Sequence, residues 1–430
     1  MGAAQSDTRL QWFGSVPKDW KIARNKNAFR VVSKTVGDRF DDFKLLSLTL
    51  QGVKLRDIES GKGKFPASFE TYQEVWPGDI VFCLFDVDET PRTVGLSPYQ
   101  GMITGAYTVV RCLALADPRY VTYFYLSIDQ RKGLRPFYTG LRKVVRTDTF
   151  LNATFPLPDL DTQKAIADFL DRETARIDQL IEKKQLLVRL LGEKARRAVS
   201  STFERLALEY QSWRLKHVLA SALAYGANEP ADGDDPNDVR YIRITDIDAD
   251  GSLRGDTFKS LPRERVRDYL LKDGDILFAR SGGTVGKAFI YSKEMGECCY
   301  AGYLIRARVN NKRVSPNFLY QFTSTDQYWN HILGTNIQAT IQNVSAEKYA
   351  NLEIPLPPRD RQDAITTEIA HRNAKISSAK SNVKMSIDRL QEFRSAMITA
   401  AVTGQIDVTT WGKSGQTDRR LDEIQEAMRA

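Results

Sequence analysis

The chain contains one unit twice. The stretch from Phe155 to Ile177 begins FPLPDLDTQKAI and returns 199 residues later, from Ile354 to Ile376, as IPLPPRDRQDAI. The two stretches share nine identities in 23 aligned positions, whereas unrelated sequences of average composition would share about one or two. A repeat this long constrains the fold more than any short motif, because each copy must form the same structural unit. We therefore predict a duplicated fold.

Each copy continues into a long helix. A Pro-Leu-Pro stop precedes Asp161 in the first copy and Asp360 in the second, and aspartate is a common helix N-cap. Roughly 45 residues without proline follow, with apolar residues at the heptad spacing of a coiled-coil seam. The predicted seam residues are Leu170, Ile177, Leu191, Ile369, Ile376, Val383, Leu390 and Met397. For one copy alone, the core helix of an ordinary domain is the alternative.

One position breaks the pattern. Lys184 occupies the place in the first helix that Val383 occupies in the second. We therefore expect the first seam to be interrupted at this point.

Chain order predicts antiparallel helices. A helix over 161–206 is about 69 Å long, and a parallel partner would force residues 207–359 to carry the chain back over that length. We expect an α/β (mixed α+β) protein, in which two globular domains are joined by a long antiparallel two-helix coiled coil in a dumbbell with pseudo-twofold symmetry. The expected segments are a first domain at 1–160, a central helix at 161–206, a second domain at 207–359, a distal helix at 360–404 and a tail at 405–430.

The two globular segments share strand and turn signals. In the first, short apolar runs alternate with turns in FKLLSLTL, WPGDIVFCLF and GAYTVVRCLAL, which is typical of a mixed sheet. Its Gly78-Asp79-Ile80 turn recurs as Gly274-Asp275-Ile276, and we match Trp20 with Trp213 because a basic residue follows each. The globules have diverged further than the helix starts, so we expect one scaffold with two different binding surfaces.

Composition predicts a soluble, cytoplasmic protein without membrane association. No apolar run reaches the length of a membrane span, and the first residues have no signal-peptide core. Four cysteines without CxxC spacing and three histidines give no basis for a metal site or a disulfide framework. The net charge of +8 is compatible with a polyanionic partner.

A basic run marks the first candidate interface. Basic side chains interleaved with aromatic ones, and no acidic residue, make up QRKGLRPFYTGLRKVVRT. Within it we select Arg142, Lys143 and Arg146 as candidate DNA phosphate contacts. A solvated strand edge protected by charge is the alternative.

A glycine-rich turn marks the second candidate interface. In FARSGGTVGKAFI, a strand leads into a turn that contains Ser281 and Gly282 and is flanked by Arg280 and Lys287. The turn is not a P-loop, because Ser281 and Ala288 stand where that pattern requires Gly and Ser or Thr. Glycines let a backbone approach a phosphate. We therefore select four residues of this turn as candidate DNA contacts: Arg280, Ser281, Gly282 and Lys287. A plain hairpin turn is the alternative.

A polar segment follows in the second globule. GTNIQATIQNVS supplies Asn336, Gln338 and Thr340, whose side chains can read base edges. These residues complete the candidate DNA contacts, with a solvated loop as the alternative.

Catalytic motifs are not found in the sequence. It has no Walker pair, no Asn-Pro-Pro-aromatic tetrapeptide of amino-methyltransferases and no Ser, His and Asp set in a motif context. We therefore predict no catalytic residue and a protein that binds.

Together these features resemble the specificity (S) subunit of Type I restriction and modification systems, over essentially the whole chain. The resemblance rests on the helix starts with Gln163 and Gln362, the duplicated Gly-Asp-Ile strands, the RSGGTVGK turn and the ending AAVTGQIDV with Gly404 as the helix stop. Thr162 and Arg361 depart from the family, whose helix starts often carry Glu before the Gln.

The resemblance implies a non-catalytic subunit with two target recognition domains. Each domain would read one half of a bipartite, asymmetric site in double-stranded DNA, and the helices would set the spacer and dock two modification (M) methyltransferase subunits. The M subunits would bind S-adenosylmethionine and methylate adenine at N6, while restriction (R) subunits would use ATP and Mg to translocate and cleave DNA. No cofactor would bind this chain.

Three other functions remain open at this point. One is a coiled-coil protein-interaction scaffold without sequence-specific DNA reading, and another is the specificity subunit of a related system in which methyltransferase and nuclease are fused. An enzyme with cryptic motifs is a third alternative.

Overall fold

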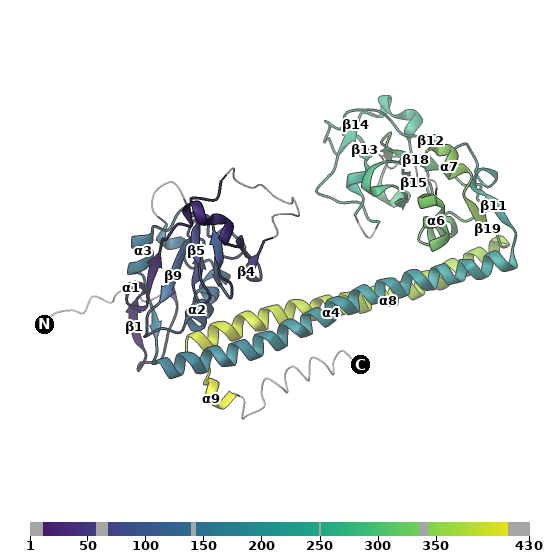
Figure 1. Cartoon of the computed structure of the whole chain (residues 1–430). Coiled ribbons are helices and arrows are strands. Elements are labelled where there is room, and N and C mark those ends of the chain that lie inside the picture. Colours follow the sequence, from purple (N-terminus) through teal and green to yellow (C-terminus); the bar gives the residue numbers. More distant parts are fainter. Residues whose placement is uncertain (1–11, 57–67, 139–142, 249–250, 335–342, 412–430) are drawn as a thin grey trace. The chain divides into compact units, whose positions relative to one another are not determined.

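The computed structural model describes residues 12–56, 68–138, 143–248, 251–334 and 343–411. The chain divides into two compact units, of which unit 1 comprises 1–185 and 383–430 and unit 2 comprises 186–382. Two long helices, α4 (Leu160–Glu209) and α8 (Arg359–Val402), pass through both units (Figure 1). Each unit therefore contains one globule, part of α4 and part of α8, as a duplicated fold requires.

Unit 1 is built on a four-stranded antiparallel sheet with the strand order β2-β9-β6-β7. Its strands are β2 (Phe29–Val32), β9 (Thr108–Cys112), β6 (Ile80–Phe82) and β7 (Val94–Leu96). Three antiparallel pairs accompany it: β1 (Lys21–Arg24) with β10 (Thr154–Leu157), β3 (Leu46–Thr49) with β4 (Gly52–Leu55), and β5 (Gln73–Val75) with β8 (Gly101–Ile103). The apolar runs predicted as strands coincide with β3, β6 and β9.

The helices of unit 1 besides α4 and α8 are short. They are α1 (Asn25–Ala28), α2 (Pro118–Gln130), α3 (Thr147–Asn152) and α9 (Val408–Trp411). Helix α2 begins where it does because the Asp117 carboxylate accepts hydrogen bonds from the backbone N–H groups of Arg119 and Tyr120, at 2.8 and 3.2 Å, and proline occupies the first helical position.

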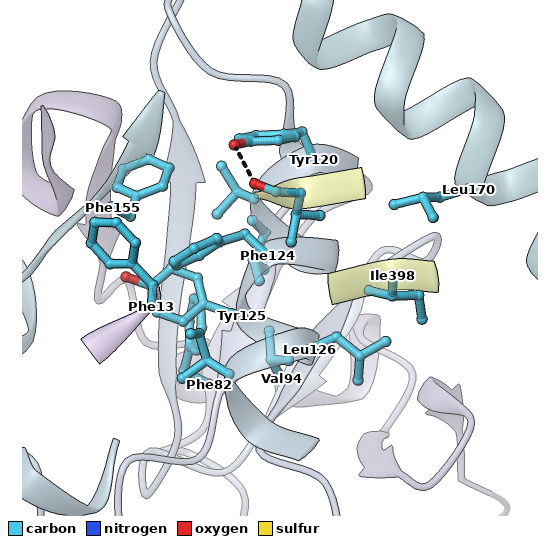
Figure 2. Packing of buried hydrophobic residues seen from close by; sticks show 14 of the residues in the cluster. Phe13, Phe82, Val94, Tyr120, Phe124, Tyr125, Leu126, Phe155, Leu170 and Ile398 are labelled. Carbon is cyan, nitrogen blue, oxygen red and sulfur yellow. Dashed lines mark hydrogen bonds between the residues drawn. The ribbon is translucent and has the colours of Figure 1, made fainter. Parts of the chain in front are cut away.

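Aromatic rings fill the core of unit 1. Figure 2 shows Phe82 of β6 and Tyr125 of α2 in this core. Their ring centroids lie 5.0 Å apart and the rings meet at 87°, an edge-to-face contact. Leu170 of α4 and Ile398 of α8 belong to the same buried cluster. The hydroxyl of Tyr120 donates to the carbonyl of Val402 at 3.4 Å. The globule and both helices of unit 1 thus share one core.

Unit 2 repeats the sheet order. Its four-stranded sheet runs β12-β18-β15-β16, formed by β12 (Ala224–Tyr225), β18 (Leu304–Ala307), β15 (Ile276–Ala279) and β16 (Ala288–Ile290). The remaining strands are β11 (Ser212–Arg214) with β19 (Glu353–Pro355), and a three-stranded sheet of β14 (Ser260–Leu261), β13 (Val239–Ile242) and β17 (Cys298–Tyr300), in which β13 and β17 are parallel. The shorter helices are α5 (Pro316–Phe322), α6 (Asp326–Gly334) and α7 (Ala346–Ala350).

The repeated glutamines make the same contacts in both units. Gln163 and Gln362 are both fully buried. Each amide oxygen accepts from the backbone N–H of the residue before a helix, Asp117 before α2 at 2.9 Å and Ser315 before α5 at 2.8 Å. Each amide nitrogen donates to the carbonyl of the second proline of Pro-Leu-Pro, at 2.8 and 2.9 Å. These glutamines tie each long helix to its globule.

The repeated Gly-Asp-Ile turns also match in detail. Asp79 accepts two hydrogen bonds from Arg111, at 2.7 and 2.9 Å, and Asp275 accepts two from Arg308, at 2.8 and 2.6 Å. Each carboxylate is almost completely buried and also accepts from the backbone N–H three residues earlier. The predicted duplication is confirmed by these equivalent contacts.

The match of Trp20 with Trp213 is wrong. In unit 1 the strand register pairs Phe155 with Ala23, and in unit 2 it pairs the equivalent Ile354 with Trp213. Trp213 therefore corresponds to Ala23. The following basic residue misled the comparison, because strand pairing and not a shared dipeptide sets the register.

The two long helices run antiparallel. In unit 2, Arg372 of α8 donates to the carbonyl of Ala198 of α4 at 3.5 Å, and a side chain added at Gly192 would lie 4.0 Å from the amine of Lys380. Rising numbers on one helix therefore meet falling numbers on the other. In unit 1, Arg394 of α8 forms a two-pronged ion pair with Asp178 of α4, at 2.9 and 3.1 Å.

The predicted seam residues lie at or near the buried side of these helices. Those that are buried are Leu170, Ile177, Ile369, Val383, Leu390 and Met397, and those that are partly buried are Leu191 and Ile376. Lys184 is also buried, at 1% exposure, and within the described part of the chain its amine has no hydrogen-bond partner. The apolar seam is therefore interrupted at this position by a lysine, and the side chain of that lysine is buried.

Candidate nucleic-acid interface

The glycine-rich turn of unit 2 joins two antiparallel strands. Arg280 directly follows β15 and Lys287 directly precedes β16, and the two strands pair with each other. The segment is thus a hairpin, as the simpler interpretation predicted. A P-loop connects a strand to a helix, so the structure agrees with the exclusion of that motif.

Two glycines shape the hairpin. Gly286 has φ of +84°, and a Cβ there would lie 2.7 Å from the ring of Trp329 in α6, so a larger residue would push the turn off the helix. Gly282 has φ of +72° and open space around its Cα. The turn is therefore held against α6 on one side and leaves its backbone accessible at Gly282.

Arg280 is held in place by a tyrosine. Its guanidinium carbon lies 4.7 Å from the ring centroid of Tyr225 in β12, a geometry that is worth about 0.5–1 kcal/mol at exposed sites. Its Nε is buried and has no hydrogen-bond partner among the described residues. The cation–π contact therefore orients this side chain, and its Nε donor is not used by any described residue.

The described end of the polar segment of unit 2 lies beside the hairpin. Ser281 forms an isolated bridge with Asn343, and the backbone N–H of Val344 donates to the carbonyl of Arg280 at 2.8 Å. Asn336, Gln338 and Thr340 lie outside the described residues. The end of their segment, at Asn343, is next to the turn.

Two exposed tyrosines flank this site, and sequence reasoning did not select them. Tyr303 is 65% exposed and its carbonyl accepts from the N–H of Arg280 at 3.1 Å, while Tyr225 is 41% exposed. Aromatic side chains beside cations are typical of nucleic-acid contacts, because bases stack on them. The signal available in the sequence was an Ala-Gly-Tyr turn between two buried strands.

Unit 1 has a different hairpin at the same place. The loop between β6 and β7 carries Asp86, Asp88 and Glu89. The N–H of Val145 donates to the carbonyl of Leu84 at 2.7 Å, which matches the Val344 contact of unit 2. The equivalent position is therefore acidic in unit 1 and glycine-rich and basic in unit 2.

The acidic loop of unit 1 partly neutralises the basic run that we selected as a candidate interface. Lys143 lies 3.6 Å from Asp88 and is hydrogen bonded to Glu89, and both interactions raise the pKa of its amine. The run itself contains no acid, but the hairpin supplies two. Arg146 is exposed, with Asp148 at 3.4 Å, and Arg142 lies outside the described residues.

Other kinds of site are not seen in the described ranges. These ranges contain no group of three or more residues that could hold a metal ion, and all four cysteines are unpaired thiols. None of the described helices combines the length and the apolar character that a membrane span needs.

Comparison with known proteins identifies relatives of this architecture. Residues 102–188 and 227–376, together more than half of the chain, match the sequence model of the Type I restriction modification DNA specificity domain. The match includes the whole hairpin of unit 2, which lies within 227–376, and leaves out the β6–β7 hairpin of unit 1, because the first matched segment begins at residue 102.

Two curated relatives share this description. The specificity subunit of Type I restriction enzyme StySPI from Salmonella potsdam is 29% identical over 150 residues, which are 34% of this chain and 32% of that protein, so the matched part is about a third of that relative's length. The specificity subunit of EcoKI from Escherichia coli K12 is 22% identical over 356 residues, which are 78% of this chain and 76% of that protein.

A solved structure has the same fold. A chain from a structure that concerns complex assembly and conformational transition of the type I R-M system superposes with a TM-score of 0.63 at 16% identity, and the alignment covers 91% of this chain and 99% of that one. The two units have the same sheet order and equivalent glutamine contacts, and more than half of the chain matches the family model. This chain belongs to the Type I restriction modification DNA specificity domain family.

Proposed function

We propose that this chain is the DNA sequence-specificity subunit of a Type I restriction–modification complex. One observation carries the proposal: two units of the same strand order present hairpins of opposite character at the same position, one acidic and one basic. Equal scaffolds with different hairpins are what a protein needs in order to read two different half-sites. Membership of the specificity-domain family supports the same function.

In this proposal each globule is a target recognition domain. In unit 2, Lys287 and the open backbone at Gly282 contact phosphates, since cations and accessible N–H groups bind the DNA backbone. Arg280 and Tyr303 lie beside them and face bases. In unit 1 the loop acids limit the phosphate contact of Lys143, so Arg146 and Arg142 carry more of it.

The long helices serve as spacer and docking surface. Helix α4 has 50 residues and is thus about 75 Å long, which exceeds the 34–36 Å between half-sites one DNA turn apart. We propose that two M subunits dock on the helices and that R subunits join them. The M and R subunits would bind S-adenosylmethionine, ATP and Mg, the chain itself would be non-catalytic, and the assembly would work in the cytoplasm.

The test is a map of adenine methylation across the genome of a host that expresses this chain with the M subunit encoded beside it. A strain that expresses the M subunit alone is the control. We expect a new split motif with one methylated adenine in each half. An unchanged map, with M soluble and bound to this chain, would favour a protein-interaction scaffold.

A second experiment tests the role of the helices. Insertion of one matched heptad into both α4 and α8 should lengthen the spacer of the methylated motif and leave both half-sites unchanged. Altered half-sites with the original spacer would contradict that role.

A further inference from the structure

Unit 2 contains a pocket of about 530 Å³ beside the start of α8. Its wall has an apolar part and a cationic part. The apolar side chains include Tyr210, Trp213 and Leu356, and the cationic ones are Lys312, Arg313 and Arg359. A pocket of this volume is large enough to hold a short peptide segment.

The cations of the pocket are only partly neutralised. Arg359 pairs with Asp363 at 2.9 Å, but its Nε is buried without a hydrogen-bond partner in the described ranges. Arg313 donates to the backbone carbonyl of His217 at 3.1 Å, which leaves its charge unpaired there. Lys312 forms no ion pair with any residue that the structure describes. Three positive charges face one carboxylate, so the pocket favours an anionic ligand.

Unit 1 shows what covers the equivalent surface there. The strand register makes Trp20 the counterpart of Tyr210. The end of α8 closes over Trp20, because a Cβ added at Gly404 would lie 3.0 Å from its ring and 2.5 Å from Pro17. Gly404 has φ of +70°, which lets the chain turn at this point.

The chain after α8 continues over the core of unit 1. Ile406, Val408 and Trp411 pack against the buried cluster that contains Leu157, the counterpart of Leu356. Leu157 is 8% exposed, whereas Leu356 in the pocket is only partly buried. Unit 1 thus covers this surface with its own chain.

The chemistry of the two surfaces differs. The residues of unit 1 that correspond to Arg313 and Arg359 are Leu115 and Leu160. An apolar segment of the same chain suits the surface of unit 1. The cations of unit 2 call for an acidic cover instead, and within the described residues no segment of the chain provides one.

We propose that this pocket binds an acidic peptide segment of a partner subunit. An apolar side chain of that segment would insert between Trp213 and Leu356, and its carboxylates would meet Lys312 and Arg313. The proposal rests on the proposed function, because it places one docking point of the modification subunit. It also makes docking unequal at the two units.

The experiment measures the affinity of the full chain for the M subunit encoded beside it, without DNA, over a series of salt concentrations. Lys312→Glu should weaken binding about tenfold at low salt, with a smaller effect at high salt, since rim charges act through screened electrostatics. Trp213→Ala should weaken binding about tenfold or more at every salt concentration, as loss of a buried aromatic anchor does. The control is Ala114→Glu, which introduces a glutamate at the corresponding exposed position of unit 1 and should leave the affinity unchanged.

Each outcome decides a point. Wild-type affinity in both pocket variants, with unchanged unfolding midpoints, overturns the pocket proposal and leaves the proposed function intact. An unchanged affinity for M with weaker DNA binding identifies the pocket as a phosphate contact and also overturns it. If the wild-type chain does not bind M at all, the proposed function fails and the pocket proposal fails with it.

Discussion

Asp275 accepts two hydrogen bonds from Arg308, at 2.6 and 2.8 Å, while its own side chain is 1% exposed. Removal of the carboxylate would leave a partly buried guanidinium and a backbone N–H, that of Lys272, without their acceptor. Loss of one partner of a buried ion pair costs about 3–5 kcal/mol. The loss falls on the central strand β15, which positions the candidate hairpin.

We therefore expect Asp275→Ala to lower the free energy of unfolding of unit 2 by about 3–5 kcal/mol, measured by urea denaturation. Asp268→Ala is the control, because Asp268 is exposed and a surface change of this kind stays within about 0.5 kcal/mol. Equal effects of the two substitutions would show that the ion pair does not support β15.

The buried glutamines allow a test in both units. Gln163→Ala and Gln362→Ala should each lower the free energy of unfolding by about 1–3 kcal/mol, because each leaves a buried N–H and buried carbonyls without partners. Gln130→Ala, at an exposed position, should have no measurable effect. A loss in one unit alone would contradict the equivalence of the two contacts.

Repeats and helix periodicity were enough to predict much of the fold. The two Pro-Leu-Pro helix starts and the two Gly-Asp-Ile turns identified the duplication, because residues that cap a helix or close a buried ion pair have few substitutes. The match of Trp20 with Trp213 failed because it relied on a tryptophan followed by a basic residue in each unit, whereas the register depends on strand partners far away in the sequence. The heptad pattern predicted that Lys184 interrupts the apolar seam, but heptad position alone does not say whether the charge of a side chain reaches water.

The candidate site was harder to predict. Composition selected Lys143 as a free cation, yet Asp88 and Glu89 reach it from a loop more than 50 residues earlier in the chain. Tyr303 is exposed at a turn between two buried strands. The alternation of apolar and polar residues along strands would instead predict that an aromatic side chain in this stretch is buried. Contacts between distant loops therefore decide which cations are available.

A comparison of Lys287 with Lys143 tests whether an unpaired lysine contributes more to DNA binding than a paired one. Lys287→Gln should weaken DNA binding at all sequences and reduce the salt slope of the affinity by about 1, because the described part of the chain supplies Lys287 with no ion-pair partner. Lys143→Gln should change the salt slope little, since Asp88 and Glu89 already hold that amine. The affinity for DNA of the complex between this chain and M is measured by fluorescence anisotropy at salt concentrations from about 50 to 200 mM, because phosphate contacts lose much of their affinity over this range. A larger effect of Lys143→Gln would exclude this assignment.

Lys184 gives a prediction about stability. Its side chain is 1% exposed at the helix pair of unit 1, and its amine has no hydrogen-bond partner among the described residues. A buried unpaired charge costs about 1–3 kcal/mol or more, so Lys184→Met should raise the free energy of unfolding by about that amount. Lys183→Met is the control, because the neighbouring lysine is exposed and its replacement should have little effect.

The same substitution has a pH signature. Burial lowers the pKa of Lys184 below its ordinary value of 10.5. Between the lowered pKa and 10.5 the unfolded chain binds more protons than the folded one at this group, so the wild-type protein gains stability as the pH rises through that window. The Met variant has no such group and gains nothing from it. The difference in unfolding free energy between the two proteins should therefore narrow from neutral pH toward pH 10.5, as measured by urea denaturation across that range. A difference that stays constant with pH would mean that the amine reaches water in the folded protein.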